Sequence, residues 1–437
     1  MLINSEKISK FLLILATLSL IIRKGIFLET FIPKPFEIFL LLALISSFFY
    51  FFPKNLDKFK IIDKKIYLAL FIFLFSMGLA TLISYLRYGV GFNTEGVLTT
   101  IRFLIIIIIF TLFYVFLKGD KIFFKRIWLS FLVPIIFIPF LIFPGLAYKF
   151  SLIKGDGRFY GFLQNPVLAS FFFLIALSFF FGLFFKNFYQ KKKLFALLFF
   201  FSSVIMVSFI FWSQSRTTWI GMIVTLITLN YLVINVFKRN KLNYVFLNFF
   251  LTFLLLVISF IILPSSAKAT FLLRIFPQYV SFIRESHPDL RTISSEQFQQ
   301  LLSRIKTEGG LPNIPGDELR PIFWKEYLKL FLKNPLGLGI NYFPVLAVKI
   351  NGEPAGTHND YLNSFAYGGL GALGTFLYML WRAFVNLRNK LKNFLSPSVV
   401  YYIGISSALA GLLICSILNG VAFINYFFWI LLVMALV

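Results

Sequence analysis

The sequence predicts an all-α integral membrane protein with about twelve transmembrane helices and one large loop that contains short helices. Hydrophobic residues make up 59% of the 437 residues, charged residues only 14%, and the mean hydropathy is +0.86. Soluble domains are close to half apolar and a quarter charged, so this composition is typical of a membrane protein. Apolar runs of about 20 residues, the length that crosses a bilayer, recur along the chain. One long stretch, residues 265–360, interrupts them and must lie outside the membrane.

The scarcity of certain side chains excludes several classes of site. Cys415 is the only cysteine, which excludes a disulfide framework and a cysteine-based metal site. His287 and His358 are the only histidines, so a histidine-rich metal centre is impossible. The sequence has no GxxxxGK[ST] loop, so nucleotide hydrolysis does not drive the protein. We therefore expect no metal, no cofactor and no nucleotide.

Each predicted span is an apolar segment bounded by polar or turn-forming residues. The twelve segments are 8–22, 36–52, 66–87, 98–117, 127–144, 166–186, 194–212, 218–237, 244–264, 361–381, 398–417 and 421–437. The last two are separated only by Asn419 and Gly420, so the sequence leaves open whether they are separate helices. The first has no small-x-small cleavage site before Arg23, so we interpret it as a retained helix rather than a signal peptide.

The distribution of basic residues predicts the orientation. With the N-terminus in the cytoplasm, the inner segments carry 22 Lys and Arg and the short outer loops carry 8. Cytoplasmic loops are enriched in Lys and Arg, so both termini are predicted to be cytoplasmic. The formal net charge of +25 is then mostly a consequence of topology, and nucleic acid is not expected as a partner.

This orientation divides the chain into three parts: helices in 1–264, the large loop in 265–360, and the last three helices in 361–437. The loop carries 11 basic and 9 acidic residues and lies opposite the positive inner segments.

Helical structure is expected within the large loop. Residues 268–286 have apolar residues at helical spacing, and Ser294 with Gln297 forms a capping box for a helix that ends near Gly309 and Gly310. Residues 320–331 are predicted to form an amphipathic helix. Its apolar face would consist of Trp324, Leu328 and Phe331.

Four polar segments at the predicted outer face stand out from the apolar background. They are Gly157 to Pro166, Ser213 to Trp219, Arg320 to Trp324 with the following Asn334 to Gly339, and Thr357 to Leu362 with the following Gly368 to Gly371. Arginines at membrane edges commonly contact lipid phosphate, and glycines near helix ends commonly form turns or allow close packing. Arg216 is different, because it lies in a short turn among four hydroxyl or amide side chains. Arg102 lies one turn inside the fourth span and should face protein or a polar cavity.

Together these segments predict a site for an anionic substrate. Guanidinium groups are permanently charged and bind a phosphate or diphosphate with paired hydrogen bonds. A histidine has an ordinary pKa near 6.5 and suits a general base. The predicted outer face has no His, Asp, Glu or Cys set at metal-ligand spacing. The chemistry indicated is attack on a substrate that carries its own diphosphate leaving group.

The ordered set of motifs resembles the O-antigen ligase and O-antigen polymerase superfamily of bacterial inner membranes. The motifs are an Arg-x-x-Gly…Asn-Pro segment from Arg158 to Pro166, the Ser215–Arg216 pair, an Arg-x-x-x-Trp helix with a Pro-Leu-Gly-x-Gly turn from Arg320 to Gly339, and a His-Asn-x-Tyr-Leu segment with Gly-Leu-Gly from His358 to Gly371. The resemblance covers roughly residues 150–385, with a small departure at Val167, where the family commonly has asparagine.

The resemblance implies a GT-C-like, metal-independent, inverting glycosyltransferase with its site on the periplasmic side. The donor would be an O-antigen glycan on undecaprenyl diphosphate, and the acceptor a sugar hydroxyl of lipid A–core, within membrane lipid. By analogy Arg158, Arg216 and Arg320 would bind the diphosphate, and His358 would be the base. We include Asn165, Ser215, Asn359 and Arg102 as supporting residues.

Other functions are weighed against this one. An O-antigen polymerase or a protein O-oligosaccharyltransferase would share the same core motifs, and the long loop beside the His358 segment favours the ligase. A lipid-linked glycan transporter or flippase would need two similar six-helix halves, which the sequence does not contain. A scaffolding protein would leave the clustered arginines and His358 without a role.

Overall fold

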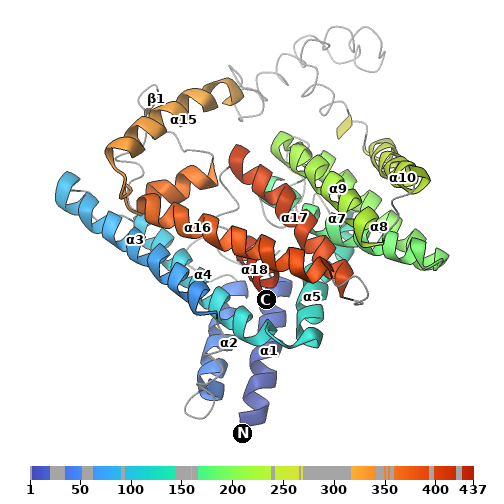
Figure 1. Cartoon of the computed structure of the whole chain (residues 1–437), viewed down its shortest axis with the longest axis horizontal. Helices are drawn as coiled ribbons and strands as arrows, with labels where there is room; N and C mark the ends of the chain where they lie inside the picture. The colour runs from blue at the N-terminus through green and yellow to red at the C-terminus, as the bar shows by residue number, and fades with distance from the viewer. Residues whose placement is uncertain are drawn as a thin grey trace.

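The computed structural model describes residues 2–19, 35–51, 63–89, 94–142, 159, 166–237, 242–264, 267–268, 316–340, 349–350, 353–354, 359–392, 398–419 and 426–437. These residues are almost entirely helical (Figure 1). The first helices are α1 (Leu2–Ser19), α2 (Pro35–Phe51), α3 (Lys64–Tyr88), α4 (Thr94–Leu117), α5 (Lys121–Ile142), α7 (Pro166–Tyr189), α8 (Lys193–Trp212), α9 (Arg216–Val236) and α10 (Leu242–Ile261). They are followed by α15 (Gly316–Lys333), α16 (Asp360–Lys392), α17 (Val399–Leu418) and α18 (Tyr426–Leu436).

The predicted spans correspond well to these helices. Each of the twelve apolar segments overlaps one helix, and α17 and α18 are separate. Among the described residues, eight helices are long and apolar enough to cross a membrane, and α2 and α18 are shorter apolar helices. The described part of the chain is therefore almost entirely helical, with the long apolar helices of an integral membrane protein. Twelve crossings, the cytoplasmic termini and the three-part division of the chain stay predictions.

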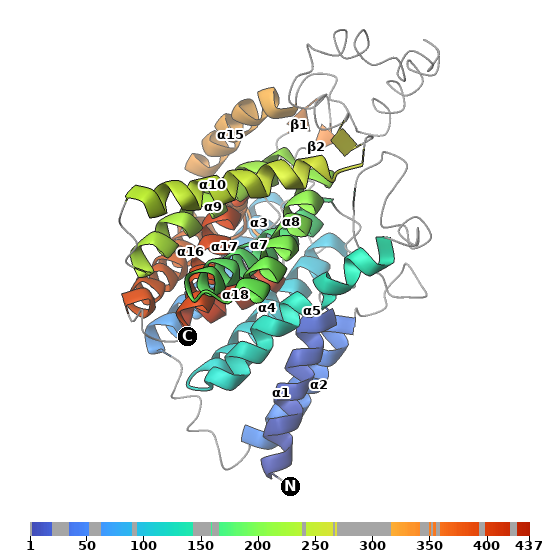
Figure 2. The same ribbon diagram turned by 90° about the vertical axis from the view of Figure 1, so that its right-hand side faces the viewer.

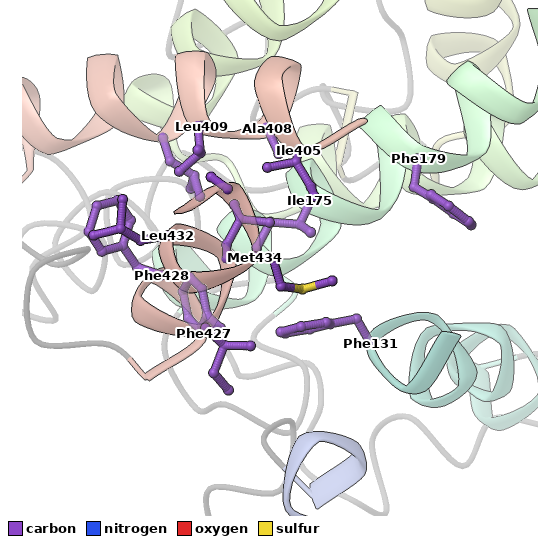
Figure 3. Close-up of a cluster of buried hydrophobic side chains, with 14 of the residues drawn as sticks. Phe131, Ile175, Phe179, Ile405, Ala408, Leu409, Phe427, Phe428, Leu432 and Met434 are labelled. Atoms are coloured by element: carbon purple, nitrogen blue, oxygen red, sulfur yellow. The ribbon is translucent and has the colours of Figure 1, made fainter. Parts of the chain in front are cut away.

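The core of the bundle is built around α7 and α18. Nearly every residue of α7 is buried, and so is α18 from Phe427 to Leu436. Figure 3 shows Phe427, Phe428 and Met434 of α18 close to side chains of α5, α7 and α17. A helix that is apolar on all sides is stable only where protein or lipid surrounds it. At eleven residues, α18 is about 16 Å long, roughly half the thickness of the hydrocarbon layer, so it is a central packing element.

The remaining helices pack around this core in pairs. The close pairs are α1 with α2, α3 with α16, α7 with α8, and α9 with α17. The α1–α2 hairpin extends from one side of the bundle, and α10 lies along α8 and α9 on another (Figure 2). Lys10 of α1 joins the hairpin to the loop after α4, with its ammonium 2.9 Å from Asp120 and 2.6 Å from Glu6.

Contacts near the helix ends show which helices begin and which finish at each end of the bundle. Near one end, Arg382 of α16 contacts Asp63 at the start of α3 at 2.5 Å. There the Asn386 side chain also donates to Ala435 O of α18 at 2.8 Å. We call this the Arg388 end, where α7, α9 and α16 finish, and we call the opposite end, where these three helices begin, the Arg216 end. The positive-charge bias predicts that the Arg388 end is cytoplasmic.

The described part of the large loop corrects one prediction. Helix α15 is longer than predicted, and its packed face differs. Phe331 is buried and Trp324 is half-buried as expected, but Leu328 is 52% exposed and Tyr327 is fully buried in its place. After Trp324, the next residue of the packed face is therefore Tyr327, three positions later, and not Leu328, four positions later. Tyr327 and Phe331 are on this face because they pack against α16.

A small antiparallel pair, β1 (Lys349–Ile350) with β2 (Glu353–Pro354), was not predicted. The helices expected within 268–286 and up to Gly310, with their capping box, lie outside the described residues apart from Lys268.

Candidate functional site

The turn between α8 and α9 places Arg216 at a helix start. The sequence predicts a turn of about five residues, but α9 begins at Arg216 and the turn is only Ser213 to Ser215. Gln214 is fully buried and has φ +55°, a backbone conformation uncommon for residues other than glycine. This conformation reverses the chain within three residues. Arg216 is consequently held in the first turn of a rigid helix, with an exposed side chain.

Polar side chains next to Arg216 connect the starts of two helices. Ser215 caps α9, with its hydroxyl accepting from Thr218 N at 3.4 Å. The Thr218 hydroxyl is 2.9 Å from the Ser215 hydroxyl and 2.7 Å from the hydroxyl of Ser170 in the second turn of α7. The starts of α7 and α9 therefore lie side by side. Ser215, predicted as a supporting residue of the site, caps α9, and its role toward a substrate stays a prediction.

The segment that carries Arg158 is attached to the same place. Phe159 N donates to Trp212 O at 3.2 Å, at the last residue of α8. The Phe159 side chain is fully buried and stacks on Phe209, with 4.8 Å between ring centroids. Arg158 and Asn165 themselves lie outside the described residues. The described residues Phe159 and Pro166, which follow Arg158 and Asn165 in the sequence, are at the Arg216 end.

The end of α17 completes this side of the bundle. The Cys415 thiol lies 3.4 Å from Thr217 O, directly after Arg216. Gly221 of α9 and Gly411 of α17 allow this close approach, because a Cβ on Gly221 would lie 2.9 Å from Gly411 O. Cys415 is fully buried, so the only cysteine of the chain has a packing role.

The segment after His358 starts α16 at the same end. The Asn359 side chain accepts from the backbone N–H groups of Tyr361 at 2.9 Å and Leu362 at 3.1 Å. Asn359 therefore caps α16, which gives this predicted supporting residue a structural role. Asp360 is fully buried in the first turn, where the positive end of the helix dipole favours a carboxylate. His358 lies outside the described residues.

Tyr361 connects this helix start to α17. Its hydroxyl is 3.5 Å from Leu413 O, and its ring lies 6.0 Å from the ring of Phe376. The starts of α7, α9 and α16 therefore gather around the end of α17. Each helix start carries a partial positive charge, so their convergence favours an anion at the Arg216 end.

A second feature, which we call the joint, connects α15 to a break within α16. The joint consists of residues 334–340 and the helix break at Gly368 and Gly369. Leu338 N donates to Ala366 O at 2.7 Å, and Leu370 N donates to Pro335 O at 3.0 Å. The loop therefore supplies hydrogen bonds to backbone groups on both sides of the break. Two glycine motifs far apart in the sequence form one structural unit.

Glycine is required at both halves of the joint. Gly369 has φ +62°, and a Cβ there would lie 2.2 Å from Pro335 O. Gly337 has φ +93°, and a Cβ there would lie 2.5 Å from Gly369 N. Both positions combine a left-handed backbone with close approach of another backbone, which only glycine permits. Close packing by these glycines was the simpler interpretation of the sequence, and the structure gives it a specific partner.

The joint is also fixed to α3. The Thr81 hydroxyl accepts from Ile340 N at 3.0 Å, and the Ser84 hydroxyl donates to Leu338 O. The Tyr88 hydroxyl donates to the Asn334 side chain at 2.8 Å. Together with the Phe331–Phe365 ring stack at 4.7 Å, these bonds hold α15 beside the first part of α16. Figure 1 shows the end of α15 near the first part of α16.

The other predicted arginines are placed only in part. Arg320 lies in α15, and its side chain is outside the described part of the structure. Arg102 of α4 is half-buried, on the side of the helix that includes the buried Thr99 and Ile106. Its role as a supporting residue of the site stays a prediction. The ring centroids of Phe103, the next residue, and Tyr367 of α16 are 5.6 Å apart. Arg102 is therefore adjacent to a residue that packs against α16.

The described residues contain no group of three or more His, Cys, Asp or Glu side chains that could hold a metal ion. Metal independence remains a prediction. Sequence reasoning missed Gln214 as a buried turn residue and Thr218 as the link between α7 and α9. The polar run from Ser213 to Thr218 was the available signal for both.

Comparison with known proteins gives one family match. The family model described as O-antigen ligase matches residues 201–379. The matched region contains the Arg216 turn, α15, the joint and the start of α16. No curated protein and no solved structure matches the chain.

The joint generates a prediction about stability. Gly369→Ala should lower the free energy of unfolding by about 2–3 kcal/mol or more, because the methyl group meets Pro335 O and the backbone is strained. The measurement is the thermal unfolding midpoint of purified protein in detergent. Gly374→Ala is the matched control in the same helix. It meets no atom within 4 Å and should be neutral or stabilising by about 0.5–1 kcal/mol. Equal midpoints for the two variants would contradict the role of the joint.

Proposed function

We propose that the protein is an O-antigen ligase, because the family model described as O-antigen ligase matches residues 201–379 and supports the O-antigen ligase and polymerase superfamily. It transfers a glycan from undecaprenyl diphosphate to a sugar hydroxyl of lipid A–core. The site lies at the Arg216 end, on the periplasmic side of a bacterial inner membrane. The observation that carries the proposal is the position of Arg216 in the first turn of α9, where the starts of α7 and α16 converge.

The convergence supports binding of a diphosphate. Arg216 has an exposed guanidinium at a helix start, so its charge and the helix dipole attract the same anion. The contact of Phe159 with Trp212 keeps the Arg158 segment at the end of α8, three residues before Ser215. The joint holds α15, which carries Arg320, beside the start of α16. Three arginines from distant parts of the sequence would then surround one leaving group.

The reaction needs one base and no acid. A sugar hydroxyl of the acceptor attacks the anomeric carbon of the donor glycan while His358 takes the hydroxyl proton. The bond between the anomeric carbon and the diphosphate oxygen breaks, and the arginines neutralise the charge that develops on the diphosphate. Attack opposite the leaving group inverts the anomeric centre. No metal ion is required, because guanidinium groups supply the positive charge.

The capping of α16 supports this role for His358. A histidine before a helix can serve simply to order the turn, and that was the competing interpretation of His358. Asn359 already satisfies the backbone donors of Tyr361 and Leu362. The start of α16 is therefore stabilised without an imidazole, so a capping role is not needed to explain His358 and its proposed role is that of the general base.

A gene deletion followed by gel analysis of lipopolysaccharide tests the proposed activity. For a ligase, the deletion strain should show core without any attached polymer, while polymer still accumulates on the lipid carrier. Core with a single repeat would instead assign the protein as an O-antigen polymerase. An unchanged lipopolysaccharide with an altered glycoprotein pattern would assign it as a protein O-oligosaccharyltransferase. Accumulation of donor on the cytoplasmic face would indicate a flippase.

Arg216 should act through both charge and the geometry of its guanidinium. Arg216→Lys keeps the charge but loses paired hydrogen bonds, each worth about 1.5–3 kcal/mol to a charged partner. Transfer by the purified enzyme should therefore fall by roughly one to two orders of magnitude. Arg87→Lys is the control, because Arg87 is an exposed arginine at the same end, beside Tyr88. If the Arg216→Lys enzyme had normal turnover, the interpretation of Arg216 as a ligand of the diphosphate would be wrong, and Arg216 would simply contact lipid phosphate.

His358 should be needed for proton transfer rather than for folding. A positioned base contributes about 10²–10⁴-fold, so both His358→Ala and His358→Gln should lose most transfer. The wild-type rate should fall below about pH 6, as protonation of the imidazole removes the base.

Asn359→Ala is the matched structural control for His358. It removes the helix cap and should lower stability by about 1 kcal/mol while leaving the acid limb of the pH profile in place. A fully active His358→Gln enzyme with no acid limb would exclude His358 as the base.

A further inference from the structure

A groove lies between α9, α16 and α17, away from the Arg216 end. It encloses a cavity of about 720 Å³. Ser406 and Ala410 of α17 form part of its floor, and their small side chains leave the space open. Phe384 of α16 and Tyr231 of α9 line its walls and are 68% and 65% exposed. Figure 1 shows α17 between α9 and α16, as this arrangement requires.

The polar side chains of the groove are concentrated at the Arg388 end. Asn235 near the end of α9, and Arg388 and Lys392 near the end of α16, line this part. The groove lining contains no Asp or Glu, and its remaining residues are mostly aliphatic or aromatic. An apolar groove with a basic mouth matches an amphipathic anion in both charge and polarity.

The two basic residues of the mouth differ from their neighbours in α16. Arg382 pairs with Asp63, and the Lys390 ammonium lies 5.5 Å from the centre of the Tyr402 ring. Within the described part of the chain, Arg388 and Lys392 have neither an ion pair nor an aromatic ring to contact. A positive-inside bias alone would not place the two unpaired cations at the mouth of a groove.

The length of the groove fits one leaflet of a bilayer. Along α16 it extends from Leu380 to Lys392, which is about 18 Å of helix, close to half of the hydrocarbon thickness. At its inner limit it reaches Leu413, whose carbonyl faces the Tyr361 hydroxyl. The residues that line the groove include neither Arg216 nor any residue of the first turn of α16.

We propose that this groove binds an anionic phospholipid of the cytoplasmic leaflet. The phosphate of the headgroup lies against Arg388 and Lys392, with Asn235 as a further hydrogen-bond donor. One acyl chain follows the floor made by Ser406, Ala410 and Leu413. This site is distinct from the donor and acceptor sites of the proposed reaction and does not depend on them.

The test is lipid binding to the purified full-length protein, measured by native mass spectrometry. The probes are phosphatidylglycerol and phosphatidylcholine of equal chain length. Phosphatidylglycerol should bind more tightly to the wild type, and the double variant Arg388→Gln/Lys392→Gln should weaken it roughly tenfold or more, since each nearby basic residue contributes about a factor of five. The control Lys192→Gln/Lys193→Gln makes the same charge change at the same end, on exposed residues outside the groove, and should bind normally.

A second variant tests the groove itself. Ala410→Phe fills the floor and should reduce binding of phosphatidylglycerol without changing the unfolding midpoint. Equal binding of the two lipids, or equal weakening by both double variants, would overturn the proposal. It would also be overturned if undecaprenyl phosphate displaced the bound phospholipid and Arg216→Lys abolished that displacement, because the groove would then hold the donor chain.

Discussion

The interruption of α16 is the constraint on which the arrangement at the Arg216 end depends. A helix in a membrane must satisfy its own backbone hydrogen bonds, and a break at Gly368 and Gly369 leaves groups that need partners from elsewhere. The loop after α15 supplies them, through Leu338 N to Ala366 O and Leu370 N to Pro335 O. Because the loop must stay in place to complete α16, α15 stays in place as well. The same loop is bonded to Thr81 and Ser84 of α3, so the break fixes three helices at once.

Much of the helical framework could be predicted because hydropathy measures the dominant force in a membrane. All twelve apolar segments overlap helices for this reason. What hydropathy could not predict is where a helix lies relative to protein and lipid. Helix α18 has the composition of a span, yet it is a short element buried on all sides. In α15, whether Tyr327 or Leu328 is buried depends on where Phe365 and Ala366 of α16 lie. The periodicity of the α15 sequence gives no information about those positions.

The motifs were easier to find than their roles. Ser215 and Asn359 were predicted as supporting residues of the site, and the structure shows that both cap helices, a role that any Ser or Asn before a helix can have. The sequence did not predict that the glycine motif after α15 contacts the one within α16. That contact depends on a break in α16, which the sequence did not predict either. Arg216 could be singled out, since a charged side chain between two long apolar helices needs a polar environment. The helix caps and the loop bonded to the helix break fix the helix starts at the Arg216 end, and the proposed diphosphate site would need such fixed positions to hold its ligand in one geometry.

Helix α16 connects the two sites described here. Its first turns follow His358 and are held by Asn359 and Tyr361, whereas its last turns form one wall of the groove. The break at Gly369 separates these two parts, so the first part can be positioned by α15 while the second follows α17. A continuous helix would transmit every adjustment of its start to its far end, because a helix is stiff along its axis. Because of the break, the first turns of α16 can have a fixed position at the Arg216 end, while its last turns line the apolar groove at the Arg388 end.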